Sequence, residues 1–430
     1  MRALPPHSVR FLFGVLVLFA LIPGWANAAT CTSIASGAWS STSTWSCGAV
    51  PTSADVVVIT GDPFGPTGYT VTVTAPAAAA SIDIRPASVG QTNTLINSAS
   101  LTVTGDIMFS TNAFSGTSKL NANLSSTTTA ANLTIASNAS TTSHLTIDTG
   151  SVSVGSVSFV GGVPSTAIIE FTDVSGSLDV TGDFGGGGTI TNTVDGLIQF
   201  VGSALQTVVG YTFGRVVVNN PVGVDMGSGS PAINDSLTIL AGDLDIGSNS
   251  LTVGGDLTVD GTLTSVGSTV TLSNPGTISG TGSLLGGTSL TANGSQTIGV
   301  GTDLVVTGGF TLAGGSSGTN NGQIEIDGNL TADTPGSTWT NAANSVLTLG
   351  GDLFYPTSGS FIGSAAPNTV IFDLLDESSA SIDTEGASTT FHHLSFSPAG
   401  PSTTLSLQTP ITVNGDLTVT AGMLDDAGNQ

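Results

Sequence analysis

Apolar and polar residues alternate along most of this chain with a period of two. Leu251-Thr252-Val253 and Tyr69-Thr70-Val71-Thr72-Val73 are typical stretches, and β-branched residues are abundant in them. This alternation predicts short β-strands in which Leu and Val point inward and Thr points outward. No amphipathic helical stretch of useful length follows residue 30, so the sequence predicts an all-β fold.

One short phrase, an apolar/Thr alternation beside a Gly-Asp or Gly-Asn corner, recurs along the chain. Its copies are LTVTGDI (101–107), LDVTGDF (178–184), LTVGGDL (251–257), IEIDGNL (324–330), LTLGGDL (347–353) and ITVNGDL (411–417). Such self-similarity marks stacked units that cannot bury an apolar face alone. We therefore expect a right-handed parallel β-helix of about 16 to 20 coils, with corner glycines that allow positive φ.

A longer repeat lies above the short phrase. Leu417 to Gln430 match Leu237 to Ser250 without a gap, and Phe213 corresponds to Phe391 at nearly the same offset in residue number. Because the matching strand Leu251-Thr252-Val253 would come next, we expect the chain to stop inside a unit of a longer protein whose missing part holds an anchor or translocation unit.

Two parts of the sequence resemble known families. Residues 31–85, through Ser36 to Trp39, Thr44 to Thr52 and Asp55 to Ile59, are similar to the start of the eight-glycine carbohydrate-associated domain. The tandem elements at 198–219 and 370–396 resemble modules of adhesin-like and autotransporter-type passenger proteins of bacteria. The resemblance implies a surface β-helix and transfers no catalytic residue.

The first 28 residues have the plan of a secretory signal peptide. Arg2 and Arg10 form the charged region, Phe11 to Ile22 the apolar core, and Ala26-Asn27-Ala28 the cleavage site. We expect a secreted or cell-surface protein with a cap module over 29–90 and solenoid repeats over 91–430, and no membrane-spanning segment in the mature chain.

Charge narrows the range of partners. After residue 28 the chain keeps Arg85, Lys119 and Arg215 against 29 acidic residues, a net charge of −26. Nucleic acid and anionic membranes are poor partners for such a chain. Solubility is the simplest reason for the acidic residues. The alternative is Ca²⁺ binding by aspartates stacked at successive corners, with Asp243, Asp256, Asp352 and Asp416 as ligands and no other cofactor expected.

The N-terminal segment holds both cysteines and two of the tryptophans. Cys31 and Cys47 lie close together in the sequence, and in an exported chain they are expected to form a disulfide that pins a small cap. Trp39 and Trp45 are large enough to close the open end of a solenoid. Stacking on carbohydrate is the alternative role for both rings.

An enzymatic role finds little support in the sequence. Asp373, Asp376 and Glu377 form the densest carboxylate group, but the matching stretch at 201–205 has no acid. The chain also carries little general acid/base equipment. We therefore expect a non-enzymatic structural or adhesive rod that contacts glycans, surface components or other copies of itself, end to end or laterally. A carbohydrate-binding or carbohydrate-cleaving β-helix is the alternative.

Overall fold

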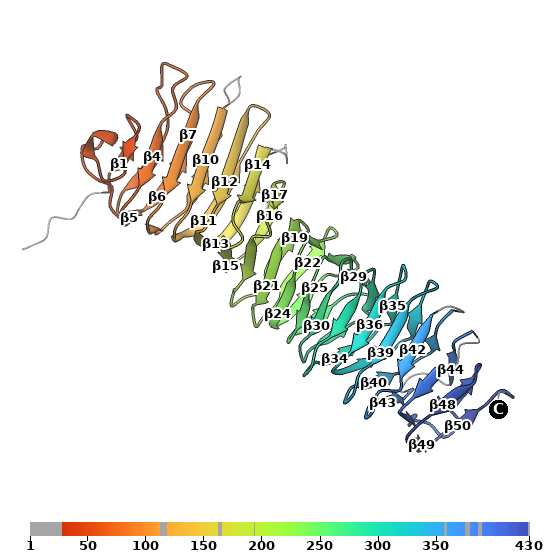
Figure 1. The fold of residues 1–430 in the computed structure, drawn as a ribbon. Helices are drawn as coiled ribbons and strands as arrows, with labels where there is room; N and C mark the ends of the chain where they lie inside the picture. Colours follow the sequence, from red (N-terminus) through yellow and green to blue (C-terminus); the bar gives the residue numbers. More distant parts are fainter. Residues whose placement is uncertain are drawn as a thin grey trace, which may run out of the picture.

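A computed structural model describes residues 28–111, 118–161, 166–192, 194–356, 359–374, 379–385 and 389–428. The chain winds into a parallel β-solenoid of about 16 turns, with one 3-10 turn, η1 (Thr42–Thr44), in the described residues. All pairings between named strands are parallel, and Figure 1 shows the resulting rod, which bends near its middle. The expected parallel β-helix is therefore confirmed. The segment expected to be a signal peptide lies, apart from Ala28, outside the described residues.

Each full turn contributes one strand to each of three faces. The first face contains the following strands, with β11 and β13 each bending around the corner to serve the first and the second face: β5 (Ala77–Ala79), β8 (Leu101–Val103), β11 (Thr128–Ala136), β13 (Ser151–Val160), β15 (Ser177–Val180), β18 (Leu197–Phe200), β21 (Arg215–Asn219), β24 (Leu237–Ala241), β27 (Leu257–Val259), β30 (Gly276–Ser279), β33 (Gln296–Ile298), β36 (Ser317–Asn320), β39 (Thr338–Asn341), β42 (Ser360–Gly363), β45 (Thr389–Phe391) and β48 (Ile411–Val413).

The second face consists of the remaining strands of the same 32-stranded sheet. Besides the second parts of β11 and β13, they are β1 (Thr30–Thr32), β3 (Val56–Ile59), β6 (Ser81–Ile84), β9 (Ile107–Phe109), β16 (Phe184–Gly186), β19 (Gln206–Val209), β22 (Val224–Ser228), β25 (Asp243–Asp245), β28 (Thr262–Thr264), β31 (Ser283–Leu285), β34 (Asp303–Val306), β37 (Gln323–Ile326), β40 (Val346–Leu349), β43 (Thr369–Phe372), β46 (His393–Phe396) and β49 (Leu417–Val419).

The third face is split into a 7-stranded and an 11-stranded sheet. The 7-stranded sheet holds β2 (Gly37–Ala38), β4 (Thr70–Val73), β7 (Thr92–Asn97), β10 (Ser118–Leu124), β12 (Thr141–Ile147), β14 (Ala167–Phe171) and β17 (Thr189–Asn192). The 11-stranded sheet holds β20 (Thr212–Phe213), β23 (Ala232–Ile233), β26 (Leu251–Val253), β29 (Thr269–Leu272), β32 (Ser289–Ala292), β35 (Phe310–Leu312), β38 (Leu330–Ala332), β41 (Leu353–Phe354), β44 (Ser379–Asp383), β47 (Thr404–Leu407) and β50 (Met423–Asp425).

The alternation of the sequence sets what each face buries. In β26 the side chains of Leu251 and Val253 are buried and Thr252 is exposed, as the pattern predicted. Repeating this arrangement turn after turn fills the interior with one continuous apolar core. Burial of that core is the main stabilising contribution, because no turn can cover its own apolar side chains.

The turns shorten where the third face is interrupted. Before the interruption, Val57, Ile82 and Ile107 stack on successive turns of the second face. Beyond it, Leu244, Leu263 and Leu284 stack in the same way at clearly shorter intervals of sequence. A cluster of buried and half-buried rings fills the interior between these two regions, formed by Phe159, Phe184, Phe200, Tyr211 and Phe213. The wider half of the rod in Figure 1 is therefore the N-terminal half.

The recurring phrase does not mark one corner of the solenoid. LTVTGDI joins the first face to the second, LTVGGDL joins the third to the first, and LTLGGDL joins the second to the third. Its unit is thus one strand plus one corner, and three such units make a turn. The longer repeat follows the same logic: Leu237 begins β24 on the first face and Leu417 begins β49 on the second, 25 strands later.

Corner glycines with positive φ do occur, for example Gly223, Gly242 and Gly280, but the glycines of the recurring phrase are not among them. None of Gly105, Gly182, Gly255, Gly351 and Gly415 has φ in the left-handed region. A Cβ added to Gly182 would lie 2.8 Å from the carbonyl oxygen of Gly155 on the neighbouring turn, and one added to Gly105 would lie 2.6 Å from that of Ala80. Glycine is therefore required at these corners because the backbones of successive turns approach closely.

Candidate functional site

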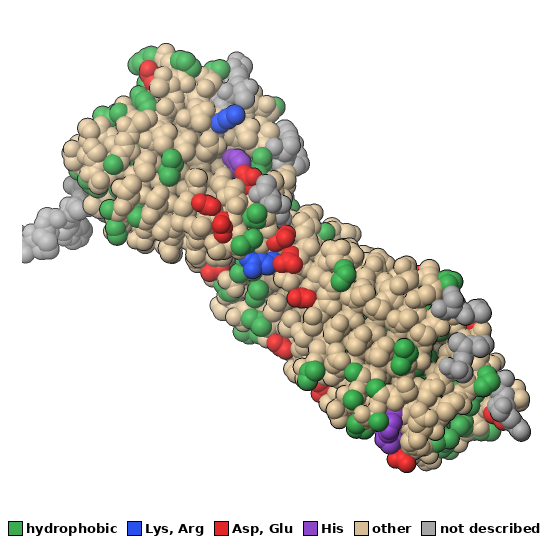
Figure 2. All heavy atoms as spheres, viewed as in Figure 1, with side chains coloured by type: hydrophobic (Ala, Val, Ile, Leu, Met, Phe, Trp, Pro, Cys, Tyr) green, Lys and Arg blue, Asp and Glu red, His purple; other side chains and the backbone are tan. Residues whose placement is uncertain are grey.

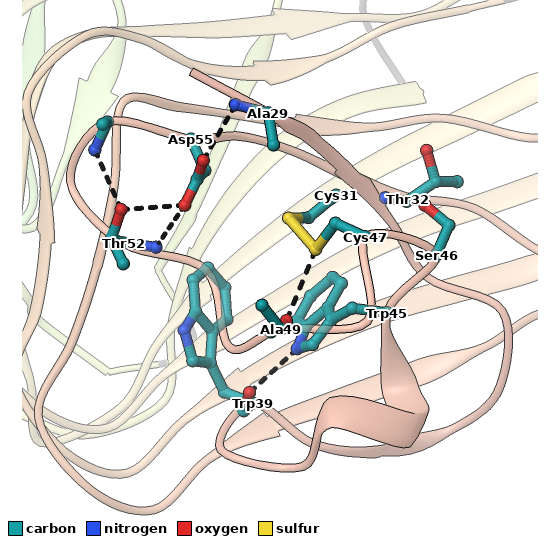
Figure 3. The surroundings of a disulfide bond; sticks show 11 residues. Ala29, Cys31, Thr32, Trp39, Trp45, Ser46, Cys47, Ala49, Thr52 and Asp55 are labelled. Atoms are coloured by element: carbon teal, nitrogen blue, oxygen red, sulfur yellow. Dashed lines mark hydrogen bonds between the residues drawn. A yellow bond between two sulfur atoms is a disulfide. The ribbon is translucent and has the colours of Figure 1, made fainter. Parts of the chain in front are cut away.

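The N-terminal end of the rod is closed by a compact cap. The chain passes from β2 to β3 through residues 39–55 without a first-face strand, and this segment covers the end of the core. Cys31 and Cys47 form a disulfide across it, which confirms the predicted pairing. Figure 3 shows the bond beside the two indole rings. A cross-link that closes so short a loop stabilises it by about 3 kcal/mol on the loop-entropy model.

Both cap tryptophans are buried. Trp39 is 3% exposed and Trp45 1% exposed, and their rings meet edge to face with centroids 5.2 Å apart. The indole N–H of Trp45 donates to the carbonyl oxygen of Trp39 at 2.8 Å. A sugar ring stacks on an open aromatic face, and neither ring offers one. This burial favours the cap role over the carbohydrate-stacking role, although Trp39 borders a groove of about 400 Å³ with Pro51 and Pro76.

Asp55 ties the cap together. Its Oδ1 accepts the backbone N–H of Ala29 at 2.9 Å, and its Oδ2 accepts the N–H and the hydroxyl of Thr52 at 2.9 and 2.8 Å (Figure 3). The bond from Ala29, followed by those from Thr52, lowers the pKa of the Asp55 carboxyl. This role of Asp55 was not predicted from the sequence, although Asp three places after Thr52 is a common signature of a local side-chain turn.

The structure does not bring the four proposed calcium ligands together. Asp243 begins β25 on the second face, Asp416 stands between the first and second faces, Asp256 between the third and first, and Asp352 between the second and third. Each has a local partner. The carboxylate of Asp243 accepts hydrogen bonds from the hydroxyls of Thr262 and Thr264. That of Asp256 accepts the N–H of Thr277, and that of Asp352 accepts the N–H and the hydroxyl of Ser381. Oδ2 of Asp416 lies 3.3 Å from Nδ1 of His393.

The reason is the drift of the phrase from corner to corner. Asp243, Asp256, Asp352 and Asp416 each stand at a different face or corner of the rod, so these four side chains do not stack. Among the residues that the structure describes, no group of three His, Cys, Asp or Glu side chains is placed to hold a metal ion.

A different set of carboxylates gathers on the second face. Asp327 and Asp373 stand one place after Ile326 and Phe372, two turns apart, with Gly350 between them. Burial, and then the charges of Asp327, Asp373 and Asp303, raise the pKa of Glu325. Burial, and then the charge of Asp327, raise the pKa of Asp373.

Of this group, only Asp373 belongs to the carboxylate group that stands out in the sequence; its other members, Asp376 and Glu377, lie outside the described residues. Asp303, Gln323 and Glu325 line a small pocket, and Asp303 and Gln323 also border a groove of about 520 Å³. The Lys and Arg residues of the chain are all at position 215 or earlier, so no such side chain offsets this acidic group.

A row of outward threonines runs along the third face of the solenoid. Thr252, Thr271, Thr291, Thr311 and Thr331 stack in register on five successive turns of the third face. Threonines on successive turns lie about 4.8 Å apart, because that is the spacing of neighbouring strands in a sheet. The five strands that carry these threonines contain no charged residue; they are β26, β29, β32, β35 and β38. Figure 2 shows long stretches of the rod whose visible side chains are neither charged nor apolar.

Comparison with models of protein families, with curated proteins and with solved structures finds no match. The likeness to adhesin-like passenger proteins and to the eight-glycine domain therefore stays a prediction. Within the described ranges, no helix is long and apolar enough to cross a membrane.

Proposed function

We propose that the protein is an exported, non-enzymatic rod that serves a structural or adhesive role at a cell surface or in an extracellular matrix. The observation that supports the proposal most directly is the repetition of the same strand arrangement along the solenoid. One apolar core runs along the described turns, a cross-linked cap covers one end, and the sides are lined by repeated hydroxyl-bearing side chains. A protein built this way is long and presents the same kinds of side chain many times along its surface.

The threonine row is the surface that we assign to contact. Hydroxyl and methyl groups at a fixed spacing can make many weak, equivalent contacts with glycans or other surface components, and their sum grows with the number of turns engaged. The row carries no charge, so these contacts avoid the repulsion that the net charge of −26 imposes on most anionic partners.

Adsorption of the purified chain from residue 29 to glycan arrays and to isolated cell surfaces tests the assignment. Substituting Thr291 and Thr311 by Lys should reduce retention several-fold, whereas the same change at Thr297 and Thr319 on the first face should not. If both double variants lost retention equally, the assignment of the third-face threonine row as the contact surface would be wrong. Recovery of the native protein only from the cytoplasm would refute the exported rod.

A carbohydrate-cleaving β-helix is the second candidate, favoured by one observation. Burial and neighbouring carboxylates raise the pKa of Glu325 and of Asp373, and a raised pKa is the direction of shift that suits a carboxyl group to general-acid catalysis. Incubating the protein with a panel of polysaccharides decides between the candidates. Depolymerisation that the substitution Asp373→Asn abolishes would replace the non-enzymatic proposal.

A further inference from the structure

The backbone of Ala29 is held on both sides, one residue beyond the expected cleavage site. Its N–H donates to Oδ1 of Asp55 at 2.9 Å, and its carbonyl oxygen accepts the N–H of Val56 at 2.9 Å. Ala29 also packs against the core, whereas Ala28 is exposed. The boundary between the ordered cap and the preceding residue therefore coincides with the Ala28–Ala29 bond that the sequence marks for cleavage.

We infer that Asp55 is the binding site for the α-ammonium group that cleavage between Ala28 and Ala29 creates, so that removal of the leader completes the cap. The inference rests on the proposed export of the protein. It goes beyond that proposal because it assigns a processing-dependent contact to a named carboxylate.

The chemistry of the step supplies the charge. Water hydrolyses the Ala28–Ala29 peptide bond, Ala28 leaves with a carboxylate, and the nitrogen of Ala29 becomes an amine that takes up a proton at neutral pH. An amide with one N–H thus becomes an ammonium with three, at an atom that already lies 2.9 Å from a carboxylate oxygen. Charge-assisted hydrogen bonds of this kind are about twice as strong as neutral ones.

The carboxylate is held in place for this contact. Thr52 donates its N–H and its hydroxyl to Oδ2 of Asp55 at 2.9 and 2.8 Å, which leaves Oδ1 directed at Ala29 (Figure 3). The carboxylate is therefore oriented before the amine arrives, and little further ordering is needed when the ammonium binds.

The folded cap also sets the order of events. Peptidases commonly bind the substrate as an extended strand through its backbone groups. In the cap, Thr30 to Thr32 are already paired with β3. Cleavage must therefore precede docking of β1. The Cys31–Cys47 disulfide lies close by, so both covalent changes of an exported protein, cleavage and oxidation, would act on the same end of the rod.

Other charged groups on the neighbouring strands have their own partners. Asp83 on β6, which pairs with β3, lies 3.3 Å from Arg85, and Asp106 accepts the side-chain amide of Asn132. The pH dependence of the Ala29 contact should consequently report on the ammonium and on Asp55. An α-amino group in an unfolded chain titrates near about pH 7.7–8.0, and a nearby carboxylate raises that pKa.

The test is a double-mutant cycle on full-length mature protein. One chain begins at Ala29, released from a fusion that leaves no extra residue, and the other begins at residue 26 and keeps Ala26-Asn27-Ala28. Each is made with Asp55 and with Asp55→Asn, in a Trp339→Phe background so that fluorescence reports the two cap tryptophans. The control is Asp62→Asn, because the Asp62 carboxylate accepts a local bond from the N–H of Phe64, two residues away, instead of a bond from Ala29.

With Asp55 present, the chain that begins at Ala29 should have a cap-unfolding equilibrium constant about tenfold smaller than the extended chain. This advantage should disappear with Asp55→Asn, persist with Asp62→Asn, and be lost as the pH rises through the raised pKa of the ammonium. Equal stability of the two chains with Asp55 intact, or an advantage that survives Asp55→Asn, would overturn the inference.

Intact mass of the protein exported by its native host separates this inference from the proposed function. A protein that does not begin at Ala29 refutes the processing step, while the cycle still reports on the bond. A protein that begins at Ala29 but shows no coupling refutes the bond and leaves export standing.

Discussion

Removing the ring of Phe184 should divide the rod into two parts that unfold separately. Phe184 is fully buried at the place where the third face is interrupted, and its ring contacts those of Phe159, Phe200, Tyr211 and Phe213 at centroid distances of 6.0, 6.2, 5.4 and 6.2 Å. In a solenoid each turn contacts only its neighbours, so the coupling between the halves passes through this layer.

The structure allows an estimate of the loss. A Phe→Ala change in a well-packed core costs about 3–5 kcal/mol, made up of lost burial and the cavity that remains. Edge-to-face ring contacts add about 0.5–1.5 kcal/mol each to the value of burial alone. The empirical range for Phe→Ala already includes the contacts that the ring makes, so four ring contacts place Phe184→Ala in its upper part, at about 4–5 kcal/mol.

Tryptophan fluorescence during unfolding in denaturant can follow each half. Trp39 and Trp45 lie in the cap, and Trp339 lies buried in β39 on the other side of the ring cluster. In one series of proteins, made on the chain from residue 29, Trp339→Phe leaves only the cap tryptophans, so that fluorescence follows the N-terminal half. In the other series, Trp39→Phe and Trp45→Phe together leave only Trp339, so that fluorescence follows the C-terminal half. Phe184→Ala should move the two transitions apart.

The matched control is Phe372→Ala. Phe372 is equally buried but lies beyond Trp339, outside the interval between the two reporters. It should lower stability without inserting a weak layer between them. Transitions that stay coincident in Phe184→Ala, or a loss below about 1 kcal/mol, would show that the ring cluster does not couple the halves.

Three further changes test other parts of the structure. Replacing Cys31 and Cys47 by Ser should destabilise the cap by about 3 kcal/mol, measured by cap fluorescence in denaturant, and an unchanged midpoint would contradict the cross-linking role. Glu325→Gln should raise the melting temperature at pH 7. The pKa of Glu325 in the folded protein is raised above 4.5, so the stability linked to this carboxyl is lost as the pH rises through that folded pKa. A gain in melting temperature that is equally large at pH 4 would contradict this cause. Gly182→Ala should cost about 1–3 kcal/mol in denaturant titrations because its Cβ would lie 2.8 Å from a backbone oxygen, whereas Gly187→Ala, with 3.6 Å available, should be tolerated.

The strand and its buried face were predictable from sequence because they depend on neighbouring residues only. The alternation in Leu251-Thr252-Val253 decides which side chains point inward, and that holds on any face of the solenoid. The disulfide was predictable for a similar reason, since Cys31 and Cys47 are the only two cysteines of the chain. Neither prediction requires knowing which turns of the solenoid lie above one another.

Positions that depend on stacking were not predictable from the phrase. Asp256 and Asp352 occupy equal places in their phrases but stand at different corners, because the number of strands between them decides the corner. Glu325 and Asp373 share a surface because the second face places their turns above one another. Their sequence separation gives no sign of this, since the turn length varies along the rod.

The longer repeat has a consequence for how the rod presents its surface. From β24 to β49 the chain makes 25 strands, which is eight turns and one strand over, so Leu237 and Leu417 begin matching segments on neighbouring faces. Phe213 and Phe391 show the same step, from the third face to the first. A module of this length cannot concentrate its equivalent side chains on one side, as a module with a whole number of turns would. Each further copy would instead turn the same surface by one face. In a rod built this way, the surface that one copy presents on one face, such as the third-face threonine row, would lie on the neighbouring face in the next copy, so successive copies would present it to partners on different sides.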